Sequence, residues 1–107
     1  MKLFIPPLGT ELELSEPWMF KLYDEYRNSN MMELMNLNSQ PYRYGEPIKT
    51  FDMVIPIGTV LKVDRIYIRK GASEFDSVTL RTKIGKKSIR FWVKLADFNT
   101  MVVKDIV

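Results

Sequence analysis

The sequence predicts a mainly β single domain with one short helix. Aliphatic and aromatic residues alternate with polar ones in several short runs, which is the pattern of half-buried strands. Proline- and glycine-containing turns separate these runs. A chain of 107 residues with 46% apolar residues is long enough to bury one core without disulfides. We therefore expect one domain over residues 1–107, folded as a small barrel.

The first half contains two expected strands. Residues 10–14 read TELEL, in which leucine alternates with glutamate. Residues 18–26 read WMFKLYDEY, where alternating large apolar residues favour a second strand. The competing interpretation of this run is a helix capped by Ser15 with Pro17 in its first turn.

One helix is expected at residues 30–37, which read NMMELMNL. Asn30 is a suitable N-cap, and the methionines and leucines recur at helical spacing. The helix is barely two turns long, so packing must hold it. Residues 38–46 are expected to form a loop, with Pro41 and Gly45 as turn residues.

Strands dominate from residue 51 onward. Leu61 and Val63 share one face of a long strand, but the next aliphatic pair, Ile66 and Ile68, is out of phase by one residue. This slip predicts a β-bulge or sharp bend at residues 64–65.

Two further strands follow, centred on residues 78–80 and 89–93, with a turn at IGKK between them. KLADFN is expected to form a helical turn and residues 101–103 a closing strand. This order of elements resembles the architecture of an SH3-like barrel, which implies a barrel at residues 51–107 and an N-terminal β and helix segment at residues 1–50 packed on it. No SH3 ligand-binding signature is present, so the resemblance implies no ligand.

A short opening occurs twice, as PLGT at residues 7–10 and PIGT at residues 56–59. Proline stiffens the approach to a strand, glycine permits the corner, and threonine suits a strand start. Two interpretations stay open: two unrelated strand-entry corners, or an internal duplication. Neither copy is a phosphate loop, because neither has a following lysine and helix.

Charge is unevenly distributed along the chain. Residues 1–59 hold five Lys/Arg and eight Asp/Glu, whereas residues 60–94 hold ten Lys/Arg and three Asp/Glu. This asymmetry indicates an anionic partner or docking between the two halves of the chain.

The basic half places cations and aromatics on one expected strand face. Cations contact phosphates and aromatic rings stack on bases, so this face is a candidate surface for nucleic acid or a protein partner. Two other interpretations stay open: a solubilising exterior, or a face covered by the acidic N-terminal half with Trp92 and Tyr67 as its contacts. The candidate residues are Arg65, Tyr67, Arg69, Arg81, Lys83, Arg90, Trp92 and Lys94.

Two further segments are candidate protein interfaces. Met31, Met32 and Met35 are flexible apolar residues of a kind used at adaptable interfaces, although packing in the core is their commoner role. The loop sequence YRY offers exposed aromatic and arginine side chains that can anchor a partner, or that can pack on one another. Its residues are Tyr42, Arg43 and Tyr44.

The composition argues against an enzyme. The chain has no cysteine and no histidine, which excludes thiol chemistry, histidine-dependent triads and the usual zinc sites. We expect no metal and no cofactor. A carboxylate- and tyrosine-based enzyme or small-molecule binder is the remote alternative. No signal peptide and no apolar run of membrane-span length is present, so we expect a cytoplasmic protein without a membrane partner.

The strings GTVLKVDRIYIRKGASEFDSVTL, RFWVKLADFN and FKLYDEYRN resemble small uncharacterised proteins of tailed bacteriophages. The resemblance covers most of the chain and implies an accessory protein made in a bacterial cytoplasm that binds and modulates a host protein or a defence or nucleic-acid machine. It implies no residue roles. We therefore expect a non-catalytic binding protein with a host protein or complex as its partner, and a nucleic-acid-binding barrel as the alternative.

Overall fold

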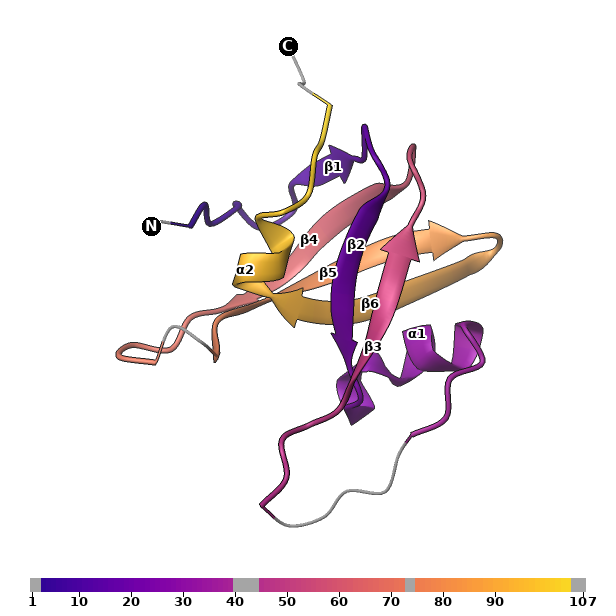
Figure 1. The fold of residues 1–107 in the computed structure, drawn as a ribbon. Coiled ribbons are helices and arrows are strands. Elements are labelled where there is room, and N and C mark those ends of the chain that lie inside the picture. The colour runs from indigo at the N-terminus through magenta and orange to yellow at the C-terminus, as the bar shows by residue number, and fades with distance from the viewer. Residues whose placement is uncertain (1–2, 40–44, 73–74, 105–107) are drawn as a thin grey trace.

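The computed structural model describes residues 3–39, 45–72 and 75–104 and contains two antiparallel sheets (Figure 1). A four-stranded sheet has the order β1-β4-β5-β6, and a two-stranded ribbon pairs β2 with β3. The prediction of a mainly β domain with a short helix is confirmed. The strands are β1 Glu11–Glu13, β2 Trp18–Tyr23, β3 Thr50–Ile55, β4 Val60–Tyr67, β5 Ser77–Ile84 and β6 Lys87–Lys94.

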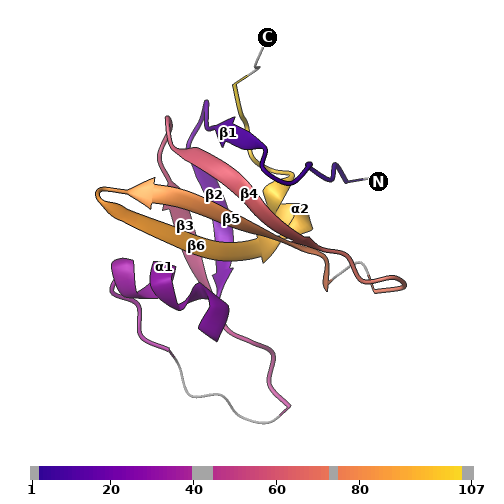
Figure 2. The same cartoon turned by 180° about the vertical axis from the view of Figure 1, so that it is seen from behind.

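The ribbon crosses one face of the four-stranded sheet, in front of it in Figure 1 and behind it in Figure 2. Its first strand, β2, shows that residues 18–26 begin with a strand, as expected, and not with a helix. Alternation decides which face is buried: Trp18, Phe20 and Leu22 point inward, while Met19 between them is 72% exposed. Phe20 stacks on Trp18 at 4.3 Å and on Phe91 of the sheet at 5.6 Å between ring centroids.

The predicted bulge is present at Asp64. The β4–β5 pairing joins Val63 to Leu80 and then Arg65 to Thr79, so Asp64 has no partner of its own. Two β4 residues thus oppose one residue of β5, which bends the strand locally. The buried side chains Leu61 and Val63 lie before this bulge, and beyond it Ile66 is half-buried.

The helical segment begins earlier than the sequence suggested. A 3₁₀ turn, η1, covers Tyr26–Asn28, and the helix α1 covers Ser29–Leu34. Asn30 therefore lies inside the first turn and is not the N-cap. The residue at the cap position is Asn28, whose side chain makes no capping bond and instead bonds to Tyr23 and Trp92.

The repeated opening forms the same turn twice. In each copy the threonine hydroxyl donates to the proline carbonyl, at 2.7 Å for Thr10 to Pro7 and 2.8 Å for Thr59 to Pro56. The glycines of both copies have positive φ, +82° at Gly9 and +87° at Gly58, as expected for the residue that makes the corner.

The two corners also sit symmetrically at the two ends of the β1–β4 pair. Gly9 N donates to Val63 O and Val63 N to Thr10 O, while Gly58 N donates to Leu14 O and Leu14 N to Thr59 O. Each glycine thus bonds to the residue that lies five positions after the glycine of the other copy: Gly9 bonds to Val63, and Gly58 bonds to Leu14. Both copies are thus strand-entry corners, and the question of duplication stays open.

The end of the chain is less regular than expected. KLADFN forms the predicted helical turn, α2 at Leu95–Phe98. The expected closing strand at residues 101–103 is only an isolated bridge between Leu14 and Val103. β1, from the first half of the chain, pairs with β4 of the second half, and β3, which begins at Thr50, pairs with β2 of the first half. The strand pairings thus join the two segments that the sequence suggested, residues 1–50 and 51–107.

The predicted interface residues Tyr42, Arg43 and Tyr44 lie outside the described residues. In the parts of the chain that are described, no helix is long and apolar enough to cross a membrane.

We predict that Gly58→Ala lowers the free energy of unfolding by about 1–2 kcal/mol, because an L side chain is strained at a positive φ. The surroundings leave open space for a methyl group, so the cost is one of backbone strain alone. Urea denaturation followed by tryptophan fluorescence measures it. Ile57→Ala, at the exposed neighbour, is the matched control. An equal loss in both variants would show that the corner has no special role.

Candidate functional site

The predicted basic residues do share one face of the four-stranded sheet. The pairings place Arg81 between Lys62 and Arg90, and Ser77 between Tyr67 and Lys94. Because cross-strand partners project to the same side, these rows form a continuous strip of cations and aromatics. Arg69 follows the end of β4 and is fixed by a bond of 2.8 Å from its amide to Asp76 Oδ1.

Two of the predicted cations are already paired. Asp64, at the bulge, lies 3.3 Å from Arg81 Nε and 2.8 Å from Arg90 Nε. The contact to Arg90 has the distance of an ion pair without the orientation of a hydrogen bond. These two arginines are partly exposed and partly neutralised, so they contribute less to an external anionic ligand than the sequence suggested.

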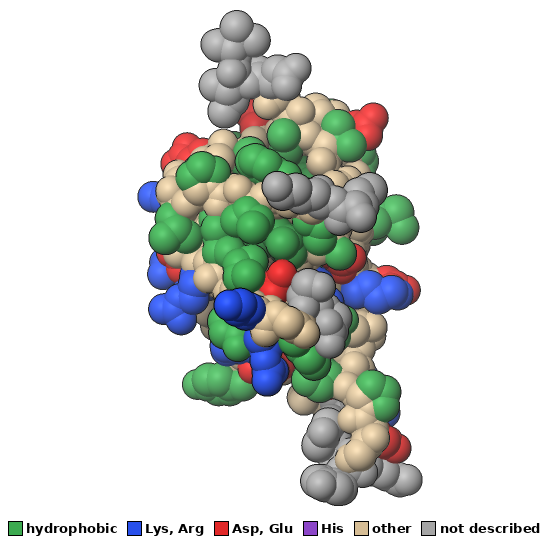
Figure 3. All heavy atoms as spheres, turned by 90° about the vertical axis from the view of Figure 1, so that its left-hand side faces the viewer, with side chains coloured by type: hydrophobic (Ala, Val, Ile, Leu, Met, Phe, Trp, Pro, Cys, Tyr) green, Lys and Arg blue, Asp and Glu red, His purple; other side chains and the backbone are tan. Residues whose placement is uncertain are grey.

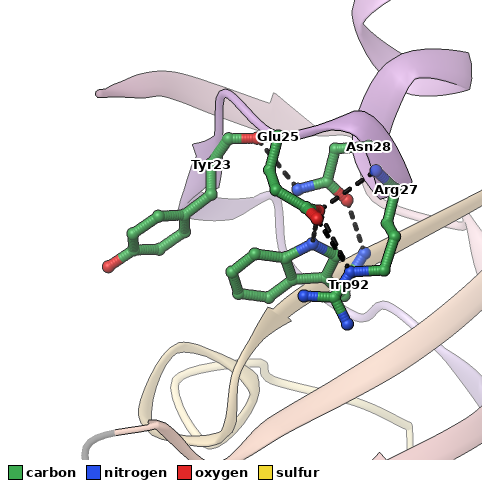
Figure 4. A network of polar contacts seen from close by, with 5 residues as sticks. All are labelled: Tyr23, Glu25, Arg27, Asn28 and Trp92. Carbon is green, nitrogen blue, oxygen red and sulfur yellow. Dashed lines mark hydrogen bonds and ion pairs between the residues drawn. The ribbon is translucent and has the colours of Figure 1, made fainter. Parts of the chain in front are cut away.

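Trp92 is covered by the N-terminal half of the chain (Figure 4). Its side chain is only 8% exposed, Tyr23 stacks against it at 5.0 Å between ring centroids, and the Arg27 guanidinium lies 5.2 Å from its ring. Its indole Nε1 donates to Glu25 Oε2 at 2.8 Å. A base cannot stack on Trp92 in this structure. The alternative in which the acidic half covers this face therefore holds for Trp92, but not for its other expected contact, Tyr67, which is exposed.

Asn28 holds the same segment against the edge of the sheet. Its Nδ2 donates to Tyr23 O at 3.0 Å, and its Oδ1 accepts from the Trp92 backbone amide at 2.8 Å. Asn28 is fully buried, so these bonds satisfy groups that would otherwise be buried without a partner. Hence η1 is fixed to β6 through both the backbone and the side chain of Trp92.

Glu25 is the acidic centre of this network. Partial burial raises the pKa of Glu25, but the hydrogen bonds from Trp92 and Arg27 together outweigh burial, and the net pKa lies below the usual value of 4.5. Arg27 contributes through its Nε, 2.9 Å from Glu25 Oε1, and through its backbone amide, 3.1 Å from Oε2. The carboxylate is therefore ionised at neutral pH, and its oxygens already accept hydrogen bonds from Arg27 and Trp92.

A hollow of about 460 Å³ opens beside this network, and we call it the cationic hollow. Its rim carries the cations Arg27, Arg69 and Lys94, and Glu25 is the one carboxylate among the described residues that line it. Tyr67 and Phe75 are each 52% exposed, and Ile48 is 44% exposed. The lining comes from η1, the approach to β3, the connection between β4 and β5, and β6. It comprises Glu25, Arg27, Ile48, Tyr67, Arg69, Phe75, Ser77, Trp92 and Lys94.

The hollow brings together four of the eight predicted residues, namely Tyr67, Arg69, Trp92 and Lys94. Arg65, Arg81, Lys83 and Arg90 lie on the same sheet but do not line it. Sequence reasoning missed Arg27, Ile48 and Phe75. Nothing in the local pattern of these residues shows that η1 and the β4–β5 connection converge.

The predicted methionines divide between core and surface. Met31 is fully buried and Met32 is 6% exposed, so both pack in the core, the commoner role for such residues. Met35 is 38% exposed and lines a second groove near the β5–β6 turn.

Exposed apolar side chains gather on another side of the molecule. Figure 3 shows hydrophobic atoms at the centre of the face that carries the N-terminal segment and α2, with Lys and Arg side chains along its lower part. Phe4 and Leu8 of the N-terminal segment are 61% and 66% exposed. Exposed apolar side chains near cations are typical of surfaces that meet proteins.

No protein family, curated protein or solved structure matches the chain. Within residues 3–39, 45–72 and 75–104, no three acidic side chains converge as a metal site would require.

We predict that Glu25→Gln lowers the free energy of unfolding at pH 7 by roughly 1 kcal/mol, because it removes the charge that Trp92 and Arg27 bind. The folded-state pKa is depressed, so the stabilisation by the carboxylate is present above about pH 4.5 and is lost as the pH falls through the folded pKa. The gap between wild type and Glu25→Gln should therefore close as the pH falls below about 4.5. Urea denaturation across this range measures it, with Glu33→Gln on exposed α1 as control. A gap independent of pH would contradict the assignment.

We predict that Asn28→Ala is more costly, at about 2–3 kcal/mol, because it leaves the Trp92 amide and the Tyr23 carbonyl buried without partners. Thermal unfolding followed by circular dichroism measures the change. Amide exchange at Trp92 provides a local check: it should accelerate more than exchange at Leu80 in the sheet centre. Unchanged exchange at Trp92 would contradict the role of Asn28.

Proposed function

We propose that this chain is a non-catalytic binding protein, a phage-encoded accessory factor acting in the bacterial cytoplasm, and that it binds a host protein through the cationic hollow. The observation that carries the proposal is the lining of the hollow by described residues: three cations, two half-exposed rings and Ile48, with the already hydrogen-bonded carboxylate of Glu25. Arginine and aromatic side chains around a concave centre are the usual anchors of protein interfaces.

The same lining supports a particular kind of partner segment. Arg69 and Lys94 form no ion pair with any described residue, so a carboxylate entering the hollow would find unpaired cations. Ile48 and Phe75 provide apolar contact beside them. A loop or helix end with an acidic residue next to an apolar one fits these contacts.

The arrangement of strands supports an SH3-like barrel as the frame. The β4-β5-β6 meander, the helical turn α2 and the Leu14–Val103 bridge follow the order that the sequence suggested. In this frame, residues 15–57 form a long excursion between two paired strands, and that excursion supplies Glu25, Arg27 and Ile48 to the hollow.

A second candidate function is single-stranded nucleic-acid binding. It is favoured by the remaining cations of the strip, because Lys62, Arg65 and Lys83 also form no ion pair in the described part of the chain. These cations continue from the hollow along the sheet, and Tyr67 is available for stacking. The burial of Trp92 weakens this candidate, since it removes one of the two predicted stacking rings.

We predict that Tyr67→Ala combined with Arg69→Glu abolishes binding of the host partner, because it removes one anchor ring and reverses one cation. Affinity capture from nuclease-treated bacterial lysate measures the loss. Lys86→Glu, on the β5–β6 turn, makes the same charge change outside the hollow and should retain the partner. A partner retained equally by all three proteins would overturn the assignment to the hollow.

Fluorescence anisotropy with labelled single-stranded DNA and RNA decides the second candidate. Nucleic-acid binding should weaken steeply with salt, with a slope that reports the number of phosphates contacted. It should also weaken in Arg65→Ala. Absence of binding at low salt leaves the protein partner as the single function.

A further inference from the structure

Three of the four outer strands of the two sheets are covered within the described chain. The outer edge of β1 bonds to the C-terminal segment, where Ser15 N donates to Val102 O and Lys104 N to Glu13 O. On β2, Lys21 N donates to Asp97 of α2 at 3.2 Å. On β6, Trp92 N donates to Asn28. Covered edges prevent unwanted strand pairing.

β3 is the exception. It pairs with β2 on one side, and no other described residue donates to or accepts from the backbone of Phe51–Ile55. An extended strand with one bare edge presents a row of amides and carbonyls that another strand can pair with. The bare edge is therefore a structural template for strand addition.

An open apolar groove of about 760 Å³ runs along the end of this edge. Its walls include Val54 and Ile55 of β3, Val60 of β4, Ile84 of β5 and Met35 after α1. Val54 is 56% exposed and Val60 is 45% exposed. The groove thus supplies apolar contacts for alternate side chains of a strand whose backbone pairs with β3.

The charges of the groove select the chemistry of its occupant. Among the described residues, Lys62, Arg81 and Lys83 line it together with one carboxylate, Glu11. Arg81 shares its charge with Asp64, but Lys62 and Lys83 form no ion pair among residues that the structure describes. These cations would attract an acidic segment.

We propose that this groove binds an extended segment of a partner protein that carries both acidic and apolar side chains on one face, and that the segment adds to β3 as a third strand of the ribbon. Every second side chain of such a strand faces the groove. The apolar ones among them contact its apolar walls, and the acidic ones meet Lys62 and Lys83. This surface is separate from the cationic hollow, and the proposal does not rest on the function assigned there.

Selection from a display library of random linear twelve-residue peptides against the whole protein tests the proposal. The enriched peptides should combine acidic and apolar residues at every second position, the spacing of side chains on one face of a strand. A synthetic copy of one should slow hydrogen exchange at β3 amides that point away from β2. Its affinity should fall about tenfold in Val54→Glu and again in the double variant Lys62→Glu with Lys83→Glu. An N-methylated copy, which cannot complete the backbone pairing, should bind far more weakly.

Two controls keep the outcome decisive. Met19 is the exposed cross-strand partner of Val54 and does not line the groove, so Met19→Glu is the first control. Lys70→Glu reverses a cation outside the groove and is the second. Both variants should bind the peptide like wild type. Thermal unfolding confirms that each variant is folded. Peptides without acidic and apolar residues at every second position, no enrichment, or binding without protection of β3 amides would each overturn the proposal. A concentration-dependent dimer lost in Val54→Glu would assign the groove to a second copy and overturn it also.

Discussion

The reciprocal hydrogen bonds between the two Pro-x-Gly-Thr corners and the β1–β4 pair are the constraint on which the rest of the fold depends. Residues 15–57 leave the sheet after Leu14 and return at Gly58, and these two residues bond to each other. The ends of a long excursion are thus held together, which reduces the loop-closure entropy that its packing must overcome. The ribbon β2–β3 can then lie across the sheet and complete the core.

The same excursion creates the two surfaces that are proposed to bind a partner. At its far end, η1 fixes Asn28 and Glu25 against Trp92, and this contact turns an exposed basic strand face into a walled hollow. Near its return, β3 approaches the β5–β6 turn and leaves one edge bare. Both surfaces therefore combine residues of the ribbon excursion with residues of the sheet, and neither half would form them alone.

Local pattern predicted the elements well because strand alternation and turn residues act over short distances. The bulge at Asp64 was visible as a one-residue slip between Val63 and Ile66. The role of Asn28 was not visible in the sequence, because its partner Trp92 is 64 residues away. An asparagine before a helix also resembles an N-cap. The strip of cations was predicted from alternation, whereas the burial of Trp92 depends on where η1 docks. Tertiary contacts of this kind leave no periodic signal in the sequence.

The position of Asp64 explains why one basic strip supports two surfaces. The bulge presents its carboxylate on the cationic face, where it engages Arg81 and Arg90 near the middle of the strip. Among the described residues, cations without an ion pair lie at both ends, Lys62 and Lys83 by the groove and Arg69 and Lys94 by the hollow. Arg65 lies between them on β4. Charge attraction is short-ranged at physiological salt, with a screening length of about 8 Å. On the two proposals, each end can therefore attract an acidic segment of its own.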